Sequence, residues 1–238
     1  MLDTLLFDLD GTLVPFVQDE FIAAYFRALV TRVAPLGYQG EQVVGALWKG
    51  TGAMLKNDGK EKNCRVFWDV FARLLGEEVR SLEPALEQFY TEEFNAVRAI
   101  LRERRELSSL MGSLREKGYT LVLATNPIFP AVAVATRMSW VGLAPEDFDY
   151  VTTYENSTYS KPDPAYYREI LEKVEKKPEQ CLMVGNNPTD DGAAALLGME
   201  LRIVTDYLEN ERGLDLGPFI CRTFREMEEE LLTLPSVK

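Results

Sequence analysis

One short stretch near the N-terminus constrains the fold more than any other part of the chain. Residues 4–12 read Thr-Leu-Leu-Phe-Asp-Leu-Asp-Gly-Thr, so an apolar run ends in Asp8 and Asp10, and Gly11 follows at once. An apolar run that stops at a glycine is typical of a buried β-strand ending in a turn. Side chains two residues apart on an extended chain point the same way. We therefore expect the two carboxylates to project together from the end of a strand.

Two carboxylates held this close repel each other, so they require a cation or a shared proton. A hard divalent cation such as Mg2+ prefers oxygen ligands of this kind. The same letters also suit a calcium loop or a plain polar turn. A calcium loop needs further oxygen ligands and a later glutamate, whereas this chain continues with Leu13-Val14-Pro15-Phe16-Val17. The pattern therefore favours a magnesium site or a structural turn over a calcium loop.

The stretch after this strand shows only helical patterns. Apolar residues recur at helical spacing over residues 16–37, 41–55, 64–75 and 83–101. We expect residues 16–95 to form an all-helical unit inserted after the first strand.

Two groups of side chains in and after this unit are expected to be structural. Six aromatic residues are predicted to pack in its interior rather than to form a binding surface: Phe67, Trp68, Phe71, Phe89, Tyr90 and Phe94. The charged run at 102–106 alternates in sign and is predicted to form a solvated, ion-paired helix face.

From Ser108 onward, predicted helices and strands alternate. The expected elements are helix 108–117, strand 119–124, strand 148–153, helix 164–174, strand 181–184, helix 188–197, strand 201–204 and a final helix 223–232. Such alternation predicts a parallel sheet with helices on both faces. We therefore predict an α/β fold: a Rossmann-like, doubly wound core made of residues 1–15 and 96–238, with the helical unit at 16–95 as an inserted subdomain.

The composition excludes several classes of function. The 238 residues include no histidine, which removes Ser-His-Asp and Cys-His catalysis and histidine metal sites. The net charge of −12 argues against nucleic acid or an anionic membrane as a partner. Three widely spaced cysteines indicate a reducing compartment, and no signal peptide or membrane-spanning run is expected. We therefore expect a cytoplasmic enzyme, either a monomer or a homodimer.

Polar residues also follow the later predicted strands or open the helices after them. Thr125 and Asn126 offer hydrogen bonds to phosphoryl oxygens, and Lys161 offers a positive charge. Asp190 and Asp191 add a second acidic group. In an open parallel sheet, ligands bind beyond the carboxyl ends of the strands, where these groups are expected to meet.

Each of these residues also has a purely structural interpretation. Lys161 suits a solvated lysine before a proline-rich turn. Asp190 and Asp191 suit the first turn of a helix that Asn187 caps.

Taken in order, four segments resemble the four motifs of the haloacid dehalogenase (HAD) superfamily of aspartate-nucleophile phosphatases. They are Phe7-Asp8-Leu9-Asp10-Gly11-Thr12, Leu123-Ala124-Thr125-Asn126, Ser160-Lys161-Pro162-Asp163-Pro164 and Val184-Gly185-Asn186-Asn187-Pro188-Thr189-Asp190. The resemblance covers nearly the whole chain. The helical unit at 16–95 is similar to the cap that such proteins place between the first two motifs.

The resemblance implies a Mg2+-dependent phosphatase that hydrolyses a small phosphorylated metabolite through an aspartyl-phosphate. Asp8 would be the nucleophile, and Asp10 would be the general acid and base. Thr125, Asn126 and Lys161 would bind the phosphate of the substrate.

The metal site implied by the resemblance consists of Asp8, Asp10, Asn186 and Asp190, with Mg2+ as the cofactor. The family usually has an acid where this chain has Asn186. An amide oxygen still suits Mg2+ but carries no charge, so weaker metal affinity is expected.

Two other functions stay open on the same scaffold. A sugar-phosphate mutase shares these motifs, and a non-catalytic binding or regulatory protein would fit a weakened metal site. Haloacid dehalogenases resemble the fold but lack the acid that corresponds to Asp10. The cap is expected to supply substrate contacts, with Trp48, Lys49 and Lys56 as candidates.

Overall fold

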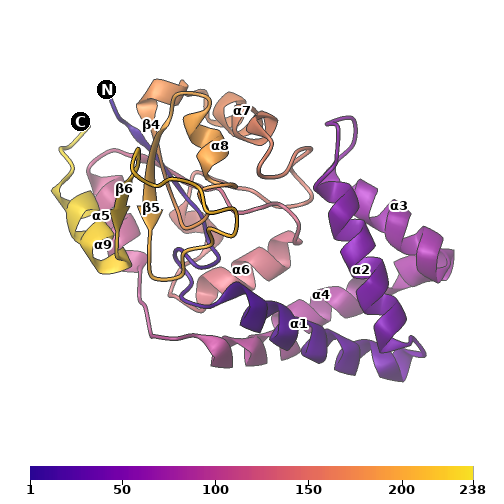
Figure 1. Cartoon of the computed structure of the whole chain (residues 1–238). Helices are drawn as coiled ribbons and strands as arrows, with labels where there is room; N and C mark the ends of the chain where they lie inside the picture. The colour runs from indigo at the N-terminus through magenta and orange to yellow at the C-terminus, as the bar shows by residue number, and fades with distance from the viewer. Residues whose placement is uncertain (238) are drawn as a thin grey trace.

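The computed structural model describes residues 1–237 and has a single six-stranded sheet within an α/β fold (Figure 1). The strands are β1 Thr4–Phe7, β2 Thr120–Leu123, β3 Tyr150–Val151, β4 Cys181–Gly185, β5 Glu200–Val204 and β6 Ile220–Arg222. All neighbouring strands are parallel, in the order β3-β2-β1-β4-β5-β6. The chain order reverses between β1 and β4, which is where open α/β sheets bind ligands.

Helices surround this sheet and extend to one side of it. The α-helices are α1 Gln18–Val33, α2 Gly40–Met54, α3 Asn63–Leu75, α4 Glu83–Thr91, α5 Ser108–Glu116, α6 Ala131–Ser139, α7 Pro164–Val174, α8 Gly192–Ala195 and α9 Phe224–Thr233. Shorter 3-10 turns are η1 Ala34–Leu36, η2 Glu77–Leu82, η3 Glu93–Ile100, η4 Pro145–Asp147 and η5 Pro178–Gln180. In the described part of the chain, no helix combines the length and apolar character that crossing a membrane requires.

Successive residues of the central strands bury the two faces of the sheet. Leu5 and Phe7 of β1 pack in the same core as α5, α6 and α9. Leu6, between them, packs in the core formed with α7 and α8. Strands that are apolar on both faces are typical of parallel sheets covered by helices. The predicted doubly wound α/β fold is confirmed.

Between Gln18 and Ile100, every residue of which is described, the structure has helices and no strand. Figure 1 shows α2 and α3 side by side at one end of the molecule, away from β5 and β6. The helix predicted over 83–101 is divided, because the chain leaves helical conformation at Glu92 between α4 and η3. The apolar pattern continues across this break, so periodicity alone did not reveal it.

The helix predicted over 188–197 is wrong for most of its length, since α8 covers only Gly192–Ala195. The side chain of Asn187 accepts hydrogen bonds from the N–H groups of Thr189 and Asp190, at 2.9 and 3.0 Å. Asn187 thus bonds the N–H groups two and three residues on, as the predicted helix cap would, and its carbonyl accepts from the Asp191 N–H at 2.8 Å, although the regular helix begins only at Gly192.

The charged run at 102–106 is not a helix, and the prediction of a solvated helix face is wrong. Arg105 is buried, with its guanidinium 3.8 Å from the centre of the Phe224 ring. Its Nη1 donates to the main-chain carbonyl of Thr12 at 2.6 Å. The alternation of charge at 102–106 could not indicate that Arg105 bonds a carbonyl so distant in the sequence.

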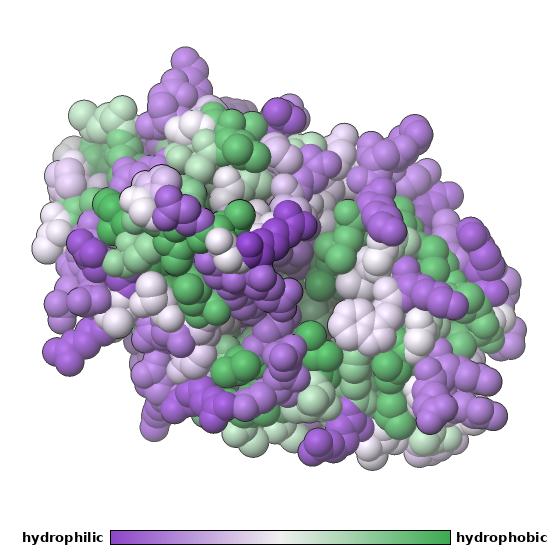
Figure 2. Space-filling view, in the orientation of Figure 1, coloured by the Kyte–Doolittle hydropathy of each residue, from purple (hydrophilic) through white to green (hydrophobic). Residues whose placement is uncertain are grey.

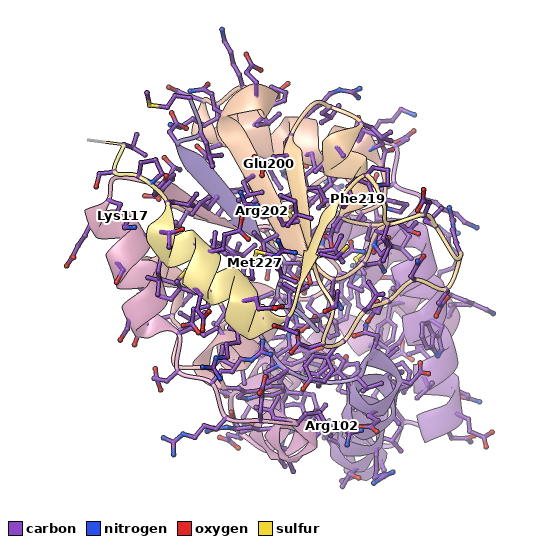
Figure 3. The ribbon with its side chains drawn as sticks, turned by 60° about the vertical axis from the view of Figure 1, so that its left-hand side comes forward. Arg102, Lys117, Glu200, Arg202, Phe219 and Met227 are labelled. Atoms are coloured by element: carbon purple, nitrogen blue, oxygen red, sulfur yellow. The ribbon has the colours of Figure 1, made fainter. Side chains whose placement is uncertain are left out.

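The sheet also has an edge strand that the sequence pattern did not predict. β6 is three residues long and pairs with β5, and its side chains are partly exposed. Beside it, α9 covers Arg202, whose guanidinium pairs with Glu200 at 2.9 Å and with Glu230 at 2.8 Å (Figure 3). A strand this short has too few residues for an apolar alternation to be recognised.

Candidate active site

Asp8 lies at the end of β1, between the two strands that flank the switch point. Its N–H bonds the carbonyl of Val184 on β4, and its carboxylate Oδ1 accepts from Lys161 Nζ at 2.8 Å. The residue is 8% exposed. Burial raises the pKa of Asp8 to about 7, although Lys161 opposes the shift. Asp8, the predicted nucleophile, is therefore paired with one buried cation, Lys161.

Lys161 is not the solvated lysine of the structural interpretation, because its side chain is 1% exposed. Its ammonium also bonds Asp191 Oδ1, at 2.7 Å. Burial alone would lower the pKa of Lys161, but Asp191 and Asp8 raise it well above its usual value. Asp163 then caps α7 through Ala165 N–H at 2.8 Å, as predicted, and so fixes the end of this loop.

The cap side of the molecule also contacts this loop. Asn63, fully buried at the start of α3, donates to Ser160 Oγ at 3.1 Å and to the Pro127 carbonyl at 3.2 Å. These contacts join α3 to the loops that carry Lys161 and Asn126. Nothing in the sequence around Asn63 distinguishes it from any other asparagine at the start of a helix, so the sequence does not indicate these contacts.

Asp10 follows Asp8 but has a different partner. Its carboxylate Oδ2 is bonded to Arg137 of α6, a fully buried residue, while Oδ1 is buried without a hydrogen-bond partner among residues 1–237. Burial raises the pKa of Asp10 even though Arg137 lowers it. A carboxyl whose pKa is raised keeps its proton to a higher pH than usual, which favours a general acid. Arg137 was missed because it stands in an otherwise apolar helix.

The turn after Asp10 brings two oxygen atoms together. Thr12 Oγ1 lies 3.3 Å from Asp8 Oδ2 and 3.2 Å from Asn186 Oδ1. The Thr12 hydroxyl has one proton and can donate it to only one of these two acceptors. The other oxygen can therefore accept a cation or another donor. Gly11 permits this approach, since a Cβ on it would stand 2.2 Å from the Asn186 amide nitrogen.

This donor set suits Mg2+. The Asp8 carboxylate and the Asn186 amide oxygen, which both lie within 3.3 Å of Thr12 Oγ1, are hard ligands, and Asp10 has a buried oxygen without a partner among residues 1–237. Within residues 1–237, no group of three or more His, Cys, Asp or Glu side chains is placed to share one ion. A metal here would therefore depend on amide and main-chain oxygens as well as on carboxylates.

The two acids of the fourth motif have different surroundings. Asp191 is fully buried, and besides Lys161 it accepts the Asn187 N–H at 3.0 Å. Gly185 makes room for it, because a Cβ there would stand 2.0 Å from the Asp191 carboxylate. The Asp190 carboxylate instead lies 3.5 Å from the Asn126 amide nitrogen, and burial raises its pKa.

The second motif lies beside this pair. Thr125 is buried at the end of β2, and its carbonyl accepts from the hydroxyls of Thr152 and Tyr166, at 2.7 and 2.8 Å. Asn126 keeps its side-chain oxygen buried without a partner among the described residues. The structure thus gathers Asp8, Asp10 and all three predicted phosphate-binding residues at one edge of the sheet.

One further carboxylate, that of Glu209, reaches this site from the loop after β5, for which the sequence predicts no element. Glu209 accepts from the Asn187 amide at 3.2 Å, and its N–H bonds the Asn186 carbonyl at 3.0 Å. Burial raises the pKa of Glu209 to about 7, and the charges of Asp10 and Asp190 contribute to the shift. Nothing in the local sequence indicates that this loop folds back over β4.

A cavity of about 800 Å3 opens above the site, with Asn126, Lys161 and Asp190 in its lining. Of the proposed cap contacts, Trp48 lines it, whereas Lys49 and Lys56 are exposed and do not. The six aromatic residues predicted to be interior are all buried. Four of them also line this cavity: Phe67, Trp68, Phe71 and Tyr90.

Known proteins resemble this chain in sequence and in fold. The chain matches the family model of haloacid dehalogenase-like hydrolases over residues 2–198. It is 26% identical over 189 residues to the pyrophosphatase PpaX of Bacillus cereus (strain Q1), covering 79% of this chain and 76% of that protein.

Two solved structures illustrate the likeness of fold. The HAD phosphatase from Thermococcus onnurineus matches with a TM-score of 0.62 at 19% identity, covering 99% of this chain and 100% of that one. The L-2-haloacid dehalogenase from Xanthobacter autotrophicus matches with a TM-score of 0.58 at 17% identity, covering 98% and 100%. Because the family model spans most of the sequence, this chain belongs to the haloacid dehalogenase-like hydrolases.

Proposed function

We propose that this hydrolase is a Mg2+-dependent phosphatase that cleaves a small phosphate ester through an aspartyl-phosphate on Asp8. The observation that carries the proposal is the buried pair of Asp8 and Lys161, 2.8 Å apart, with Asp10 close by and its pKa raised. A nucleophilic carboxylate, a cation for the phosphoryl oxygens and an acid for the leaving group are the parts that phosphoryl transfer needs.

The reaction has two steps in this proposal. An Asp8 carboxylate oxygen attacks phosphorus, the bond from phosphorus to the alcohol oxygen breaks, and Asp10 gives its proton to that oxygen. Asp10 then takes a proton from water, whose oxygen attacks phosphorus and releases phosphate from Asp8. Lys161, Thr125 and Asn126 bind the phosphoryl oxygens in both steps.

Mg2+ would be held by Asp8, the main-chain carbonyl of Asp10 and Asn186, with Asp190 as a further acid of the site. When bound, it would shield the anionic nucleophile from the anionic substrate. Lys161 contributes part of the same shielding, since it neutralises Asp8 directly.

Residues 16–95 serve as a cap over this site, and residues 1–15 and 96–238 form the catalytic core. Asn63 supports this division, because it bonds the loops of the second and third motifs from the cap side. The free thiols of Cys64, Cys181 and Cys221 favour a reducing compartment such as the cytoplasm.

Phosphate release from a panel of phosphorylated compounds, with Mg2+ and with EDTA, tests the proposal. We expect release that depends on Mg2+ and falls by at least about a thousandfold in Asp8→Asn. Asp163→Asn is the matched control, since asparagine caps a helix as well as aspartate does. Near wild-type rates in Asp8→Asn would reject the nucleophile, and no release from any compound would favour a mutase or a binding protein.

A further inference from the structure

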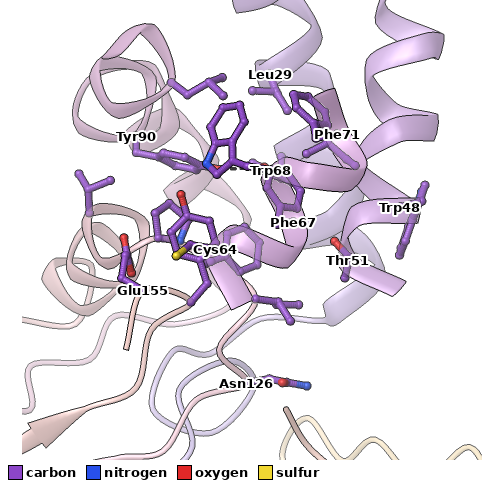
Figure 4. Close-up of a pocket in the computed structure, with 18 of the residues that line it drawn as sticks. Leu29, Trp48, Thr51, Cys64, Phe67, Trp68, Phe71, Tyr90, Asn126 and Glu155 are labelled. Atoms are coloured by element: carbon purple, nitrogen blue, oxygen red, sulfur yellow. Dashed lines mark hydrogen bonds between the residues drawn. The ribbon is translucent and has the colours of Figure 1, made fainter. Parts of the chain in front are cut away.

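The cavity above the site lies between the helices at 18–91 and the loops that follow β2 and β3. Figure 4 shows Asn126 at one end of it, with Trp68, Phe71 and Leu29 at the other. Figure 2 shows a hollow between the sheet half and helices α2 and α3, with hydrophobic residues at its side. Lys161 lines the cavity and also bonds Asp8 at 2.8 Å. Because Lys161 contacts both, an ester whose phosphoryl group is bound at Asp8 and Lys161 would extend its leaving group toward this space.

The wall of the cavity away from Lys161 is made of aliphatic and aromatic side chains. Representative lining residues are Leu29, Val43, Leu47, Phe67, Phe71 and Phe129. Rings pack there in stacked and edge-to-face pairs, such as Phe67 with Phe71 at 5.2 Å and Trp68 with Phe71 at 5.6 Å. A wall of this kind favours a flat apolar group over a hydrated polar one.

The charged residues of the lining also favour an apolar leaving group. Among the described residues, each cation in the lining already has an acidic partner: Arg65 has Glu61, Arg80 has Asp69 and Glu77, and Lys161 has Asp8 and Asp191. Glu83, Glu87 and Glu155 add negative charge to the lining. A second phosphate or a carboxylate on the leaving group would meet acids here without a free cation to balance it.

The volume of the cavity also distinguishes between small and large candidate substrates. A cavity of about 800 Å3 is in the range of pockets that hold drug-sized molecules, roughly 300–1,000 Å3. Inorganic pyrophosphate, the substrate in the name of the relative from Bacillus cereus, would leave most of this apolar space unfilled. Apolar space left unfilled contributes nothing to binding.

We propose that the substrate is a phosphomonoester of a large apolar alcohol that contains a ring, with the ring held against partly exposed apolar side chains of the lining such as Leu47, Ile128 and Phe129. This inference rests on the proposed phosphatase activity and names its substrate class. Hydrolysis of this ester follows the two proposed steps. The alcohol oxygen leaves with the proton of Asp10, and water supplies the fourth oxygen of the released phosphate.

A series of esters with alcohols of similar acidity tests the substrate class. Phosphate release is measured with Mg2+ for ethyl, benzyl and naphthylmethyl phosphate, and for inorganic pyrophosphate. We expect kcat/KM to rise by at least about tenfold from the ethyl to the naphthylmethyl ester, because the ring fills the apolar wall. A flat series, or a preference for pyrophosphate, would overturn the inference.

A charge placed in the wall provides a second test. Leu47→Asp changes a half-buried lining residue of α2, and Leu74→Asp makes the same change at a 44% exposed residue of α3 that does not line the cavity. We expect Leu47→Asp to lower the ratio of kcat/KM between naphthylmethyl and ethyl phosphate by about tenfold. Leu74→Asp should keep the wild-type ratio, and equal ratios in both variants would contradict the assignment of the wall.

Binding of inert analogues separates this inference from the proposed function. Naphthylmethylphosphonate and methylphosphonate are titrated into the protein by calorimetry, with no turnover required. Tighter binding of the naphthyl compound, by about tenfold or more, supports the apolar class even if no ester is hydrolysed, and in that case only the phosphatase proposal fails. Equal affinities would reject the apolar class whatever the activity.

Discussion

At the scale of single residues, Asn186 is where this chain departs from the HAD pattern, and both ends of its amide have a hydrogen-bond partner. Its Nδ2 donates to the Tyr207 carbonyl at 2.7 Å, while its Oδ1 faces Thr12. The amide nitrogen thus ties the loop after β5 to the end of β4. An aspartate in this position would lose that donor and place a carboxylate oxygen against a carbonyl.

We expect Asn186→Asp to strengthen Mg2+ binding but to destabilise the metal-free protein. Added charge should tighten Mg2+ binding by about tenfold, measured by calorimetry without substrate. The Tm in EDTA should fall, because two acceptors then face each other, and Mg2+ should restore it. Ser109→Asp adds the same charge at an exposed residue of α5 and is the control. An unchanged Mg2+ titration in Asn186→Asp would place this residue outside the metal site.

Glu209 gives a pH dependence whose sign follows from its raised pKa. Burial raises the pKa from 4.5 to about 7, so between these values the folded protein holds a proton that the unfolded chain has lost. This side chain therefore makes the protein less stable as the pH rises from about 4.5 to about 7.

Because glutamine does not titrate, Glu209→Gln should become more stable relative to the wild type across that window. The difference in Tm, measured in EDTA, should grow with pH and level off above about 7. Glu211→Gln changes an exposed residue of the same loop and is the matched control. A difference in Tm that does not vary with pH would contradict the burial of Glu209.

At the scale of elements, the turn after β1 is held from outside by the segment 102–106. Arg105 bonds the Thr12 carbonyl and stacks on Phe224 of α9, so it links the turn after β1 to the last helix. The Thr12 hydroxyl, which contacts Asp8 and Asn186, depends on the position of this backbone.

Removing this brace should cost stability. We expect Arg105→Met to lower the free energy of unfolding by about 2 kcal/mol, since it removes a charged hydrogen bond to a buried carbonyl. Arg104→Met, at an exposed neighbour, should change it by less than about 0.5 kcal/mol. Urea unfolding measures both, and equal losses in the two variants would show that the Arg105 contact does not stabilise the turn.

Elements with a strong apolar pattern could be predicted from sequence. β1, β2, β4 and β5 are each buried runs, and α7 has the predicted bounds because Asp163 and Pro164 mark its start. Elements decided by distant contacts could not be predicted. β6 is one of these, since it has three residues and forms by pairing with β5. The helix expected at 188–197 is regular only over Gly192–Ala195.

At the scale of the whole molecule, the sheet order explains why the predicted site residues meet. Residues that follow β1, β2, β3 and β4 meet beyond the carboxyl ends of the strands, where the strand order reverses, so the four motifs come together. Arg137 and Glu209 could not be foreseen, because a helix face and a loop bring them there from outside the motifs. The apolar cavity likewise arises only when helices and core loops are placed together.

A phosphoryl group trapped on Asp8 would test the central proposal most directly. The protein is mixed with Mg2+ and an ester that it hydrolyses, quenched in acid within one turnover, and its peptides are analysed by mass spectrometry. We expect a phosphorylated peptide that contains Asp8 in the wild type and no such peptide in Asp8→Asn. Phosphate release without any phosphorylated peptide, or a phosphoryl group on another residue, would contradict an aspartyl-phosphate at the end of β1.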